Sequence, residues 1–241
     1  MTFTSIILLP NVQVGCTLHV MDNPRDDTPN KDFRPNGAFS IAAVRSDPET
    51  QGMEAAFAAV HVQLVTKFRE EEDLEDTINE REALISVRDR VLDKLVRSFE
   101  LRLLDLVNKN RDDARYRRYL KNGLRAVTEA DARTVEPQLV RDIIKTLDED
   151  QAKPDFAPLY NEYRDKFQAA VEGVEDADKA CTQIEEQLEF LHEKTITELK
   201  LKWVEERKIL HAELTKKFPH DSARVESYFR RFARPRAKKK A

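Results

Sequence analysis

The sequence predicts a mostly α-helical protein: a long antiparallel helical hairpin, coiled-coil-like, preceded by a short irregular or β N-terminal segment. Three observations support this fold class. Charged residues make up 36% of the 241 residues and glycines number only five, a composition typical of long exposed helices. Prolines are missing from 49–136 and from 159–218, so a helix can run through each of these segments. In both segments apolar residues recur at alternating steps of three and four.

Residues 1–46 are predicted to form an extended or β N-terminal arm. Three short apolar runs in this region, Thr4–Leu9, Gln13–Val20 and Ala38–Val44, fit short strands. The stretch MDNPRDDTPNKDFRPNG separates the second run from the third and is rich in turn-forming residues. The runs form either a small β-structure or an arm that lies along the helices.

Residues 47–232 are predicted to form the helical hairpin bundle. Its first long helix begins at Asp47, which can cap the helix, with Pro48 in the first turn, and ends at about Val107. Alternating steps from Phe57 reach thirteen positions, of which nine are apolar: Phe57, Val60, Leu64, Lys67, Glu71, Leu74, Ile78, Arg81, Ile85, Arg88, Leu92, Leu95 and Phe99.

The second long helix has a more regular apolar stripe. The same stepping meets only apolar residues: Tyr160, Tyr163, Phe167, Ala170, Val174, Ala177, Cys181, Ile184, Leu188 and Leu191. The register shifts near Thr195, after which Leu199, Trp203 and Leu210 carry the face to about Lys217. Phe218–Pro219 then ends the helix, and Asp221 caps a last short helix.

The connector 108–158 determines the predicted orientation of the two long helices. It contains a basic short helix around Asp113–Leu120, a break at Asn122–Gly123, and a helix with Pro137 in its first turn that ends at about Asp148. A parallel pair would need this connector to travel back along the full length of a helix. Since much of the connector is predicted to be helical, an antiparallel hairpin is favoured.

Two blocks of sequence resemble a group of uncharacterised bacterial helical-hairpin proteins. They are RYRRYLKNGL (Arg115–Leu124) and FPHDSARVESYFRR (Phe218–Arg231). The resemblance covers about 53–231, although Leu120 and Lys121 stand where that group has Phe-Pro. It implies the hairpin fold and carries over no function and no site.

The basic tail 233–241, with the residues just before it, is the main candidate binding site. Seven basic residues lie in 229–241 without any acid: Arg230, Arg231, Arg234, Arg236, Lys238, Lys239 and Lys240. The preceding 228 residues carry 34 Lys and Arg against 45 Asp and Glu. Three interpretations remain open: the tail binds nucleic-acid phosphates, it binds an acidic partner such as the chain's own Glu70–Asp76, or it only maintains solubility. The stretch ARPR (Ala233–Arg236) is similar to an AT-hook, but alanine replaces the glycine of that motif.

A second basic cluster lies in the connector: Arg111, Arg115, Arg117, Arg118, Lys121 and Arg125. Tyr116 and Tyr119 are interleaved with it and could stack on bases. The alternative, which we favour, is that the tyrosines pack at the hairpin tip while the arginines face water or pair with Asp112 and Asp113.

Catalytic and metal-binding motifs find little support. Glu189 and His192 form an E-x-x-H, but a di-iron site needs further carboxylates and these two residues flank the apolar stripe. His61 and His211 could be neighbours across an antiparallel pair, but we interpret them as isolated surface histidines. Cys181 lies on the apolar stripe and is interpreted as a core residue rather than a reactive thiolate. The sequence has no G-x-S-x-G motif and no glycine-rich phosphate loop.

These observations predict a non-enzymatic structural or scaffolding protein without a cofactor. Some large apolar residues lie off the main seams and favour self-association into a dimer or higher assembly: Leu84, Val87, Val91, Phe190, Trp203 and Val204. The predicted partners are a second copy or another protein. The alternative is a nucleoid-type nucleic-acid-binding protein that uses the tail. Two cysteines, Cys16 and Cys181, and no apolar run long enough to span a membrane predict a cytoplasmic location.

Overall fold

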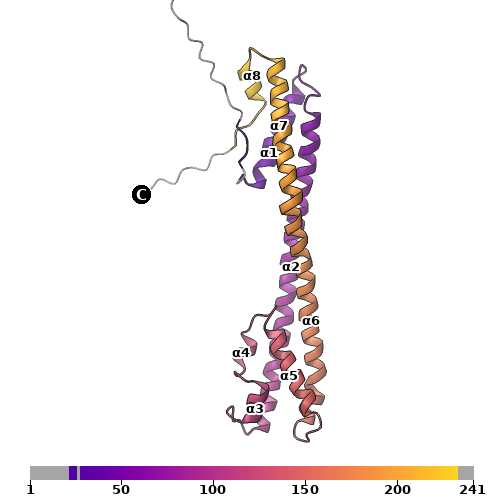
Figure 1. Cartoon of the computed structure of the whole chain (residues 1–241), viewed down its shortest axis with the longest axis vertical. Helices are drawn as coiled ribbons and strands as arrows, with labels where there is room; N and C mark the ends of the chain where they lie inside the picture. Colours follow the sequence, from indigo (N-terminus) through magenta and orange to yellow (C-terminus); the bar gives the residue numbers. More distant parts are fainter. Residues whose placement is uncertain (1–21, 26–27, 233–241) are drawn as a thin grey trace, which may run out of the picture. The chain divides into compact units, whose positions relative to one another are not determined.

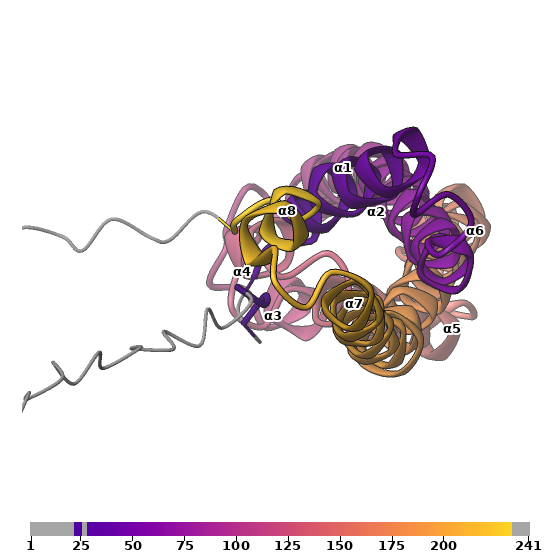
Figure 2. The same cartoon turned by 90° about the horizontal axis from the view of Figure 1, so that it is seen from above.

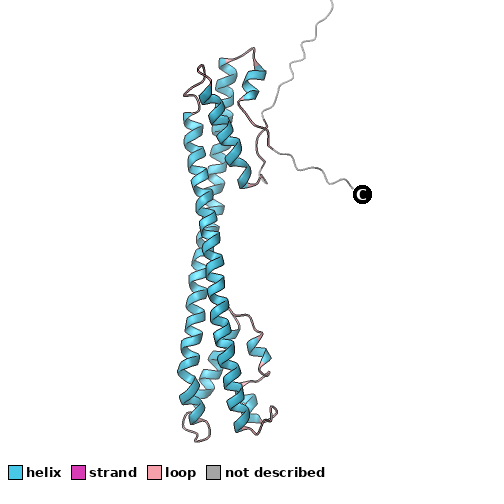
Figure 3. Cartoon of the chain, turned by 180° about the vertical axis from the view of Figure 1, so that it is seen from behind, coloured by secondary structure: helices cyan, strands magenta, loops and turns pink. Residues whose placement is uncertain are grey.

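The computed structural model describes residues 22–25 and 28–232, and these residues are mostly helical, with no strand among them (Figures 1 and 3). The elements in chain order are α1 (Asn30–Ser46), α2 (Ala55–Leu106), α3 (Ala114–Tyr119), α4 (Arg125–Thr128), α5 (Glu136–Asp150), α6 (Ala157–Phe190), the π-helix η1 (Leu191–Ile196), α7 (Thr197–Lys217) and α8 (Ser222–Ser227). The chain packs as two units. The first unit comprises Met1–Val65 with Glu198–Ala241, and the second comprises Thr66–Thr197.

The second unit is built on α2 and α6, which run antiparallel within it. The hydroxyl oxygens of Ser98 and Tyr163 lie 2.8 Å apart, and Glu71 pairs with His192 further along both helices. Residue numbers of contacting pairs thus fall on α2 as they rise on α6. The core between the helices is apolar, and the Phe99 ring centroid lies 5.4 Å from those of both Tyr163 and Phe167 in edge-on contacts.

The connector adds three helices to the second unit. The short basic helix around Asp113–Leu120 is confirmed as α3, which Asp113 caps by accepting a hydrogen bond from the Arg115 amide at 2.8 Å, and Pro137 lies in the first turn of α5 as predicted. The predicted break is the turn at Gly123, whose φ of 81° favours glycine. The short helix α4 follows it and was not predicted. α5 packs on α6 and buries one apolar stripe: Val140, Ile143, Ile144 and Leu147.

The first unit is built around the indole of Trp203 on α7. Its ring centroid lies 5.1 Å from those of Phe33 on α1 and Phe57 on α2, and its Nε1 donates to Nδ1 of His61 at 3.2 Å. α1 can approach α2 closely because Gly37 of α1 faces His61 of α2. Any residue other than glycine would place its Cβ 2.2 Å from the His61 imidazole, which is too close. Figure 2 shows α1, α7 and α8 of this unit viewed along the helices.

The prediction of a strand at Ala38–Val44 is wrong, because this run is the second half of α1. Five residues of α1 are buried and repeat at helical spacing: Phe33, Asn36, Gly37, Ser40 and Val44. The strand interpretation did not weigh the small residues among them, Gly37 and Ser40. The runs Thr4–Leu9 and Gln13–Val20 lie outside the described residues. The predicted extended arm is therefore a helix over Asn30–Ser46.

The first long helix begins later than predicted. α2 starts at Ala55, after a turn in which Gly52 has a φ of 94°. Asp47 accepts from the Glu49 amide as a cap would, but its carboxylate also binds Arg224 and Tyr228 near α8. These hydrogen bonds, that of Tyr228 first, lower the pKa of Asp47 to about 2. The predicted end of the helix, about Val107, is confirmed, since α2 ends at Leu106.

The predicted register shift near Thr195 is confirmed by the π-helix η1. η1 is one π-helical turn over Leu191–Ile196, inserted between α6 and α7. One extra residue in the turn moves the apolar positions that follow, so Ile196, Trp203, Leu210 and Leu214 are buried. The prediction that Trp203 carries the face after the shift is therefore confirmed, and the prediction that it lies off the seam is wrong. Val87, Val91 and Phe190 are exposed as predicted.

Leu103 and Leu101 on α2 offer a matched test of this core. Leu103 is fully buried, whereas 64% of Leu101 is exposed. We expect Leu103→Ala to lower the free energy of unfolding by about 2–5 kcal/mol and Leu101→Ala to change it by less than about 0.5 kcal/mol. Urea denaturation followed by circular dichroism measures both. Equal losses would contradict the assignment of the buried face of α2.

Candidate functional site

A buried arginine on α7 marks the place from which the basic tail extends. Arg207 is 1% exposed although it lies on an otherwise apolar stripe between Trp203 and Leu210. Its Nη1 donates to the carbonyl of Asp22 at 2.5 Å and to Oδ1 of Asn23 at 3.3 Å, and its Nη2 donates to the carbonyl of Arg230 at 3.2 Å. The guanidinium thus binds the two ends of the described chain.

Aromatic rings enclose the Arg207 guanidinium. Its carbon lies 5.8, 5.1 and 5.3 Å from the ring centroids of Trp203, Phe229 and Phe232. Burial lowers the pKa of Arg207 to about 10, and the charges of Asp22 and Glu226 oppose this shift. Because that pKa is still well above neutrality, the core of the first unit contains a positive charge balanced by carbonyl oxygens and ring faces.

The two chain ends also bind each other at this point. The amide of Phe232 donates to Oδ2 of Asp22 at 3.0 Å. Arg230 and Arg231, the first two basic residues of the candidate site, are exposed next to this contact. The other five, Arg234, Arg236, Lys238, Lys239 and Lys240, lie outside the described residues. Phe232, the last described residue, is therefore held beside Asp22.

Sequence reasoning missed Arg207. The signal was available, since an arginine four residues after Trp203 and three before Leu210 occupies a position of the buried stripe. A charged residue at such a position requires internal partners. Nothing in the sequence indicates that these partners are carbonyls at positions 22 and 230.

The basic cluster of the connector is largely neutralised by acids. Five of its six cations form ion pairs: Arg111–Glu100, Arg115–Asp113, Arg117–Asp112, Arg118–Glu149 and Arg125–Glu129. Tyr116 and Tyr119 are buried and donate to Glu100 and Asp150 at 2.6 and 3.0 Å. The interpretation that the tyrosines pack inside while the arginines pair with acids is confirmed, so the rings are not available to stack on bases.

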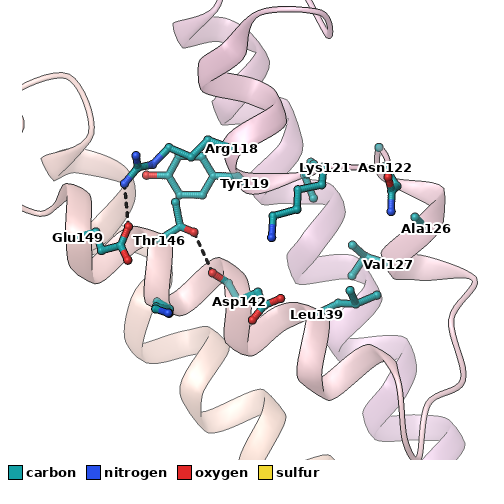
Figure 4. A pocket seen from close by; sticks show the side chains of 13 residues that line it. Arg118, Tyr119, Lys121, Asn122, Ala126, Val127, Leu139, Asp142, Thr146 and Glu149 are labelled. Carbon is teal, nitrogen blue, oxygen red and sulfur yellow. Dashed lines mark hydrogen bonds and ion pairs between the residues drawn. The ribbon is translucent and has the colours of Figure 1, made fainter.

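A polar pocket of about 330 Å³ lies beside this cluster, between the end of α3, the loop after it, α4 and α5 (Figure 4). The Arg118–Glu149 ion pair closes one end, and Lys121 extends from the loop toward α5. Val127 and Leu139 form its apolar wall. Cations and carboxylates line the pocket together, which suits a small zwitterion or water, but no lining residue is an activated nucleophile.

The most perturbed acid of the second unit is Glu136, the first residue of α5. Its side chain is buried and Oε1 has no hydrogen-bond partner among the described residues. Burial raises the pKa of Glu136 to about 9, and a hydrogen bond to Asp89 together with the charges of Asp89 and Asp93 on α2 adds to the shift. Glu136 is therefore protonated at neutral pH. It lines none of the pockets described here.

The other candidate catalytic and metal-binding residues lie apart from one another. His192 pairs with Glu71, while Glu189 is exposed beside it. His61 and His211 do not bind each other: His61 is buried and accepts from Trp203, and His211 lies 3.0 Å from Glu226, so the interpretation of both as isolated surface histidines is wrong. Cys181 is buried in the core, and burial raises the pKa of its thiol. Among the described residues, no three His, Cys, Asp or Glu side chains are placed to hold a metal ion.

Comparison of the chain with protein-family models, with curated proteins and with solved structures finds no match. The resemblance to uncharacterised bacterial hairpin proteins therefore stays a prediction. Among the residues that the structure describes, no helix combines the length and the apolarity needed to cross a membrane.

Glu136 generates a prediction of pH dependence. The folded state keeps its proton up to about pH 9, whereas the unfolded chain loses it near the ordinary value of 4.5. The folded state thus binds more protons between these values, so its stability falls as pH rises, by at most about 1.4 kcal/mol per pH unit. Glu136→Gln removes this loss, and we expect it to stabilise the protein more at pH 8 than at pH 5. Urea denaturation at both values measures the difference.

The control for this experiment is Glu129→Gln, a change to an exposed glutamate of the same connector. It should shift stability equally at both pH values. A Glu136→Gln effect that does not grow with pH would contradict the assignment of a protonated carboxyl.

Proposed function

We propose that this protein is a non-enzymatic scaffold that assembles with further copies of itself through its long helices. The observation that carries the proposal is the exposure of large apolar side chains on helices that already have a core. Val87 and Val91 on α2 are 57% and 56% exposed, and Phe190 on α6 is 58% exposed. Val87 and Val91 lie one turn apart on α2, and exposed apolar residues that form a patch mark interaction surfaces, whereas single ones do not.

The proposed architecture is the antiparallel helical hairpin predicted from the sequence. Two sets of contacts support it, each within its own unit. In the second unit, contacts between α2 and α6 follow antiparallel order from Glu71–His192 to Arg102–Glu162. In the first unit, the beginning of α2 packs against α7 through His61 and Trp203.

The non-enzymatic character rests on the state of the reactive groups. The buried cysteine has a raised thiol pKa, and the buried arginine and glutamate bind groups of their own core. The cytoplasmic location stays a prediction from the cysteine content.

Self-association is the first test of this proposal. We expect sedimentation velocity to show dimers or larger species whose fraction grows with concentration up to tens of micromolar, because association follows mass action. A monodisperse monomer throughout this range would contradict the proposed function.

The alternative function is nucleic-acid binding through the basic tail. Arg230 and Arg231 favour it, since both are exposed where Arg207 fixes the start of the tail. The tail region has seven basic side chains that could displace counterions from nucleic-acid phosphates. The affinity of such binding falls steeply as the salt concentration rises.

The two functions are separated by titrating duplex DNA and an RNA at two salt concentrations, with the full chain and with a variant lacking 233–241. The scaffold proposal predicts no salt-sensitive binding that depends on the tail. Tight binding at low salt that is lost in the shortened variant, with unchanged helical circular dichroism, would instead establish the alternative.

A further inference from the structure

One face of the second unit carries two grooves between α2 and α6 that are three heptads apart. The apolar groove, of about 680 Å³, has a floor of Val91, Leu95, Ala169, Ala170 and Gly173. The polar groove, of about 480 Å³, is lined by side chains that include Glu70, Leu74, Gln187, Phe190 and Leu191.

Residues lining the two grooves differ by 21 on both helices. Glu70 corresponds to Val91 and Leu74 to Leu95 on α2, while Ala169 corresponds to Phe190 on α6. In a pair of supercoiled helices a spacing of three heptads returns to the same face. The two grooves therefore belong to one continuous surface of the second unit.

Charges on the α2 part of this surface are segregated except at Lys67, a base that lines the polar groove among the acids. Heptad spacing places three exposed acids toward the N-terminal half, Glu70, Asp73 and Glu80, and three exposed bases toward the C-terminal half, Arg81, Arg88 and Lys94. The three bases form no ion pair among the described residues, and of the acids Glu70 is paired with Lys67. A surface of this kind attracts a second copy that runs in the opposite direction.

A twofold axis at the level of Arg81 would place each of these three α2 acids opposite an α2 base of the second copy. Glu70 then faces Lys94 of the second copy, Asp73 faces Arg88, and Glu80 faces Arg81. Such an isologous contact uses the same surface twice, so each of these pairs forms two times.

The same axis brings the exposed phenyl ring to the apolar groove. Arg88 reaches over Gly173, and Ser98 contacts Tyr163, so Arg81 is level with Ala180 on α6. Rotation about that level moves Phe190 next to Ala170 of the second copy. Ala169 and Ala170 are small and line the groove there, and the Arg88 guanidinium, which lies over Gly173, would flank the entering ring.

We propose that the α2–α6 face of the second unit is the self-association surface, which pairs antiparallel with the same face of a second copy and inserts Phe190 into its apolar groove. This inference rests on the proposed function and specifies its interface. The charges select the direction of pairing, and burial of Phe190 and Val91 supplies the favourable free energy of association.

Two charge-reversed proteins test the pairing by sedimentation velocity. One carries Arg81→Glu and Lys94→Glu, and the other carries Glu70→Lys and Glu80→Lys. Each alone should associate at least about tenfold more weakly than the unchanged protein, because attraction becomes repulsion at symmetry-doubled contacts. Their equimolar mixture should recover the affinity, since every changed residue then faces an opposite charge.

A matched control carries Glu75→Lys and Glu82→Lys, which change the net charge equally on the other side of α2. It should associate like the unchanged protein. Phe190→Ala should weaken association about tenfold, whereas Leu201→Ala, which removes another exposed apolar side chain, should not.

The outcomes separate the two proposals. If the unchanged protein stays monomeric, the proposed function fails together with this surface. If it associates but the reversed pairs behave like the control, or their mixture does not recover, the inferred surface is wrong and the proposed function stands. Circular dichroism of each variant shows that a loss of association is not a loss of folding.

Discussion

Two helices with apolar residues at alternating steps of three and four can cover only part of each other's surface, and the architecture of the second unit follows from this limit. One sector of α2 and α6 is closed by their mutual contact, where Phe99, Tyr163 and Phe167 interlock. α5 covers a second sector with its apolar stripe. The remaining sector keeps Val87, Val91 and Phe190 in water, and it is there that we place the self-association surface.

The first unit satisfies a different constraint, because it buries a positive charge. Arg207 is held by carbonyl oxygens and aromatic rings rather than by a carboxylate partner. Such an arrangement fixes the backbone whose carbonyl oxygens accept these hydrogen bonds. One side chain therefore holds the backbone at both residue 22 and residue 230. Arg207 thereby joins the two ends of the described chain, residues 22 and 230.

The extent of the long helices and the starts of two other helices could be predicted because they depend on local chemistry. Pro137 at the start of α5, Asp221 as the cap of α8, and the register shift near Thr195 act over a few residues, whereas the predicted cap Asp47 lies eight residues before α2. α1 was missed because its buried face contains Gly37 and Ser40, which are small for close packing rather than apolar. The roles of Arg207 and Glu136 depend on groups distant in sequence, and no local pattern specifies such partners. Of the candidate site, the exposed Arg230 and Arg231 were predicted but their anchor was not.

Disulfide cross-linking of single-cysteine variants tests the central claim of antiparallel self-association most directly. In a background with Cys16→Ser and Cys181→Ala, Arg81→Cys places a thiol at the proposed axis, next to its own copy. Val91→Cys would lie about 30 Å from its copy by helical rise. We predict that mild oxidation yields a covalent dimer of the Arg81→Cys protein and not of the Val91→Cys protein. A covalent dimer of the Val91→Cys protein would contradict the account. So would the absence of a covalent dimer from both variants at a concentration where the protein associates.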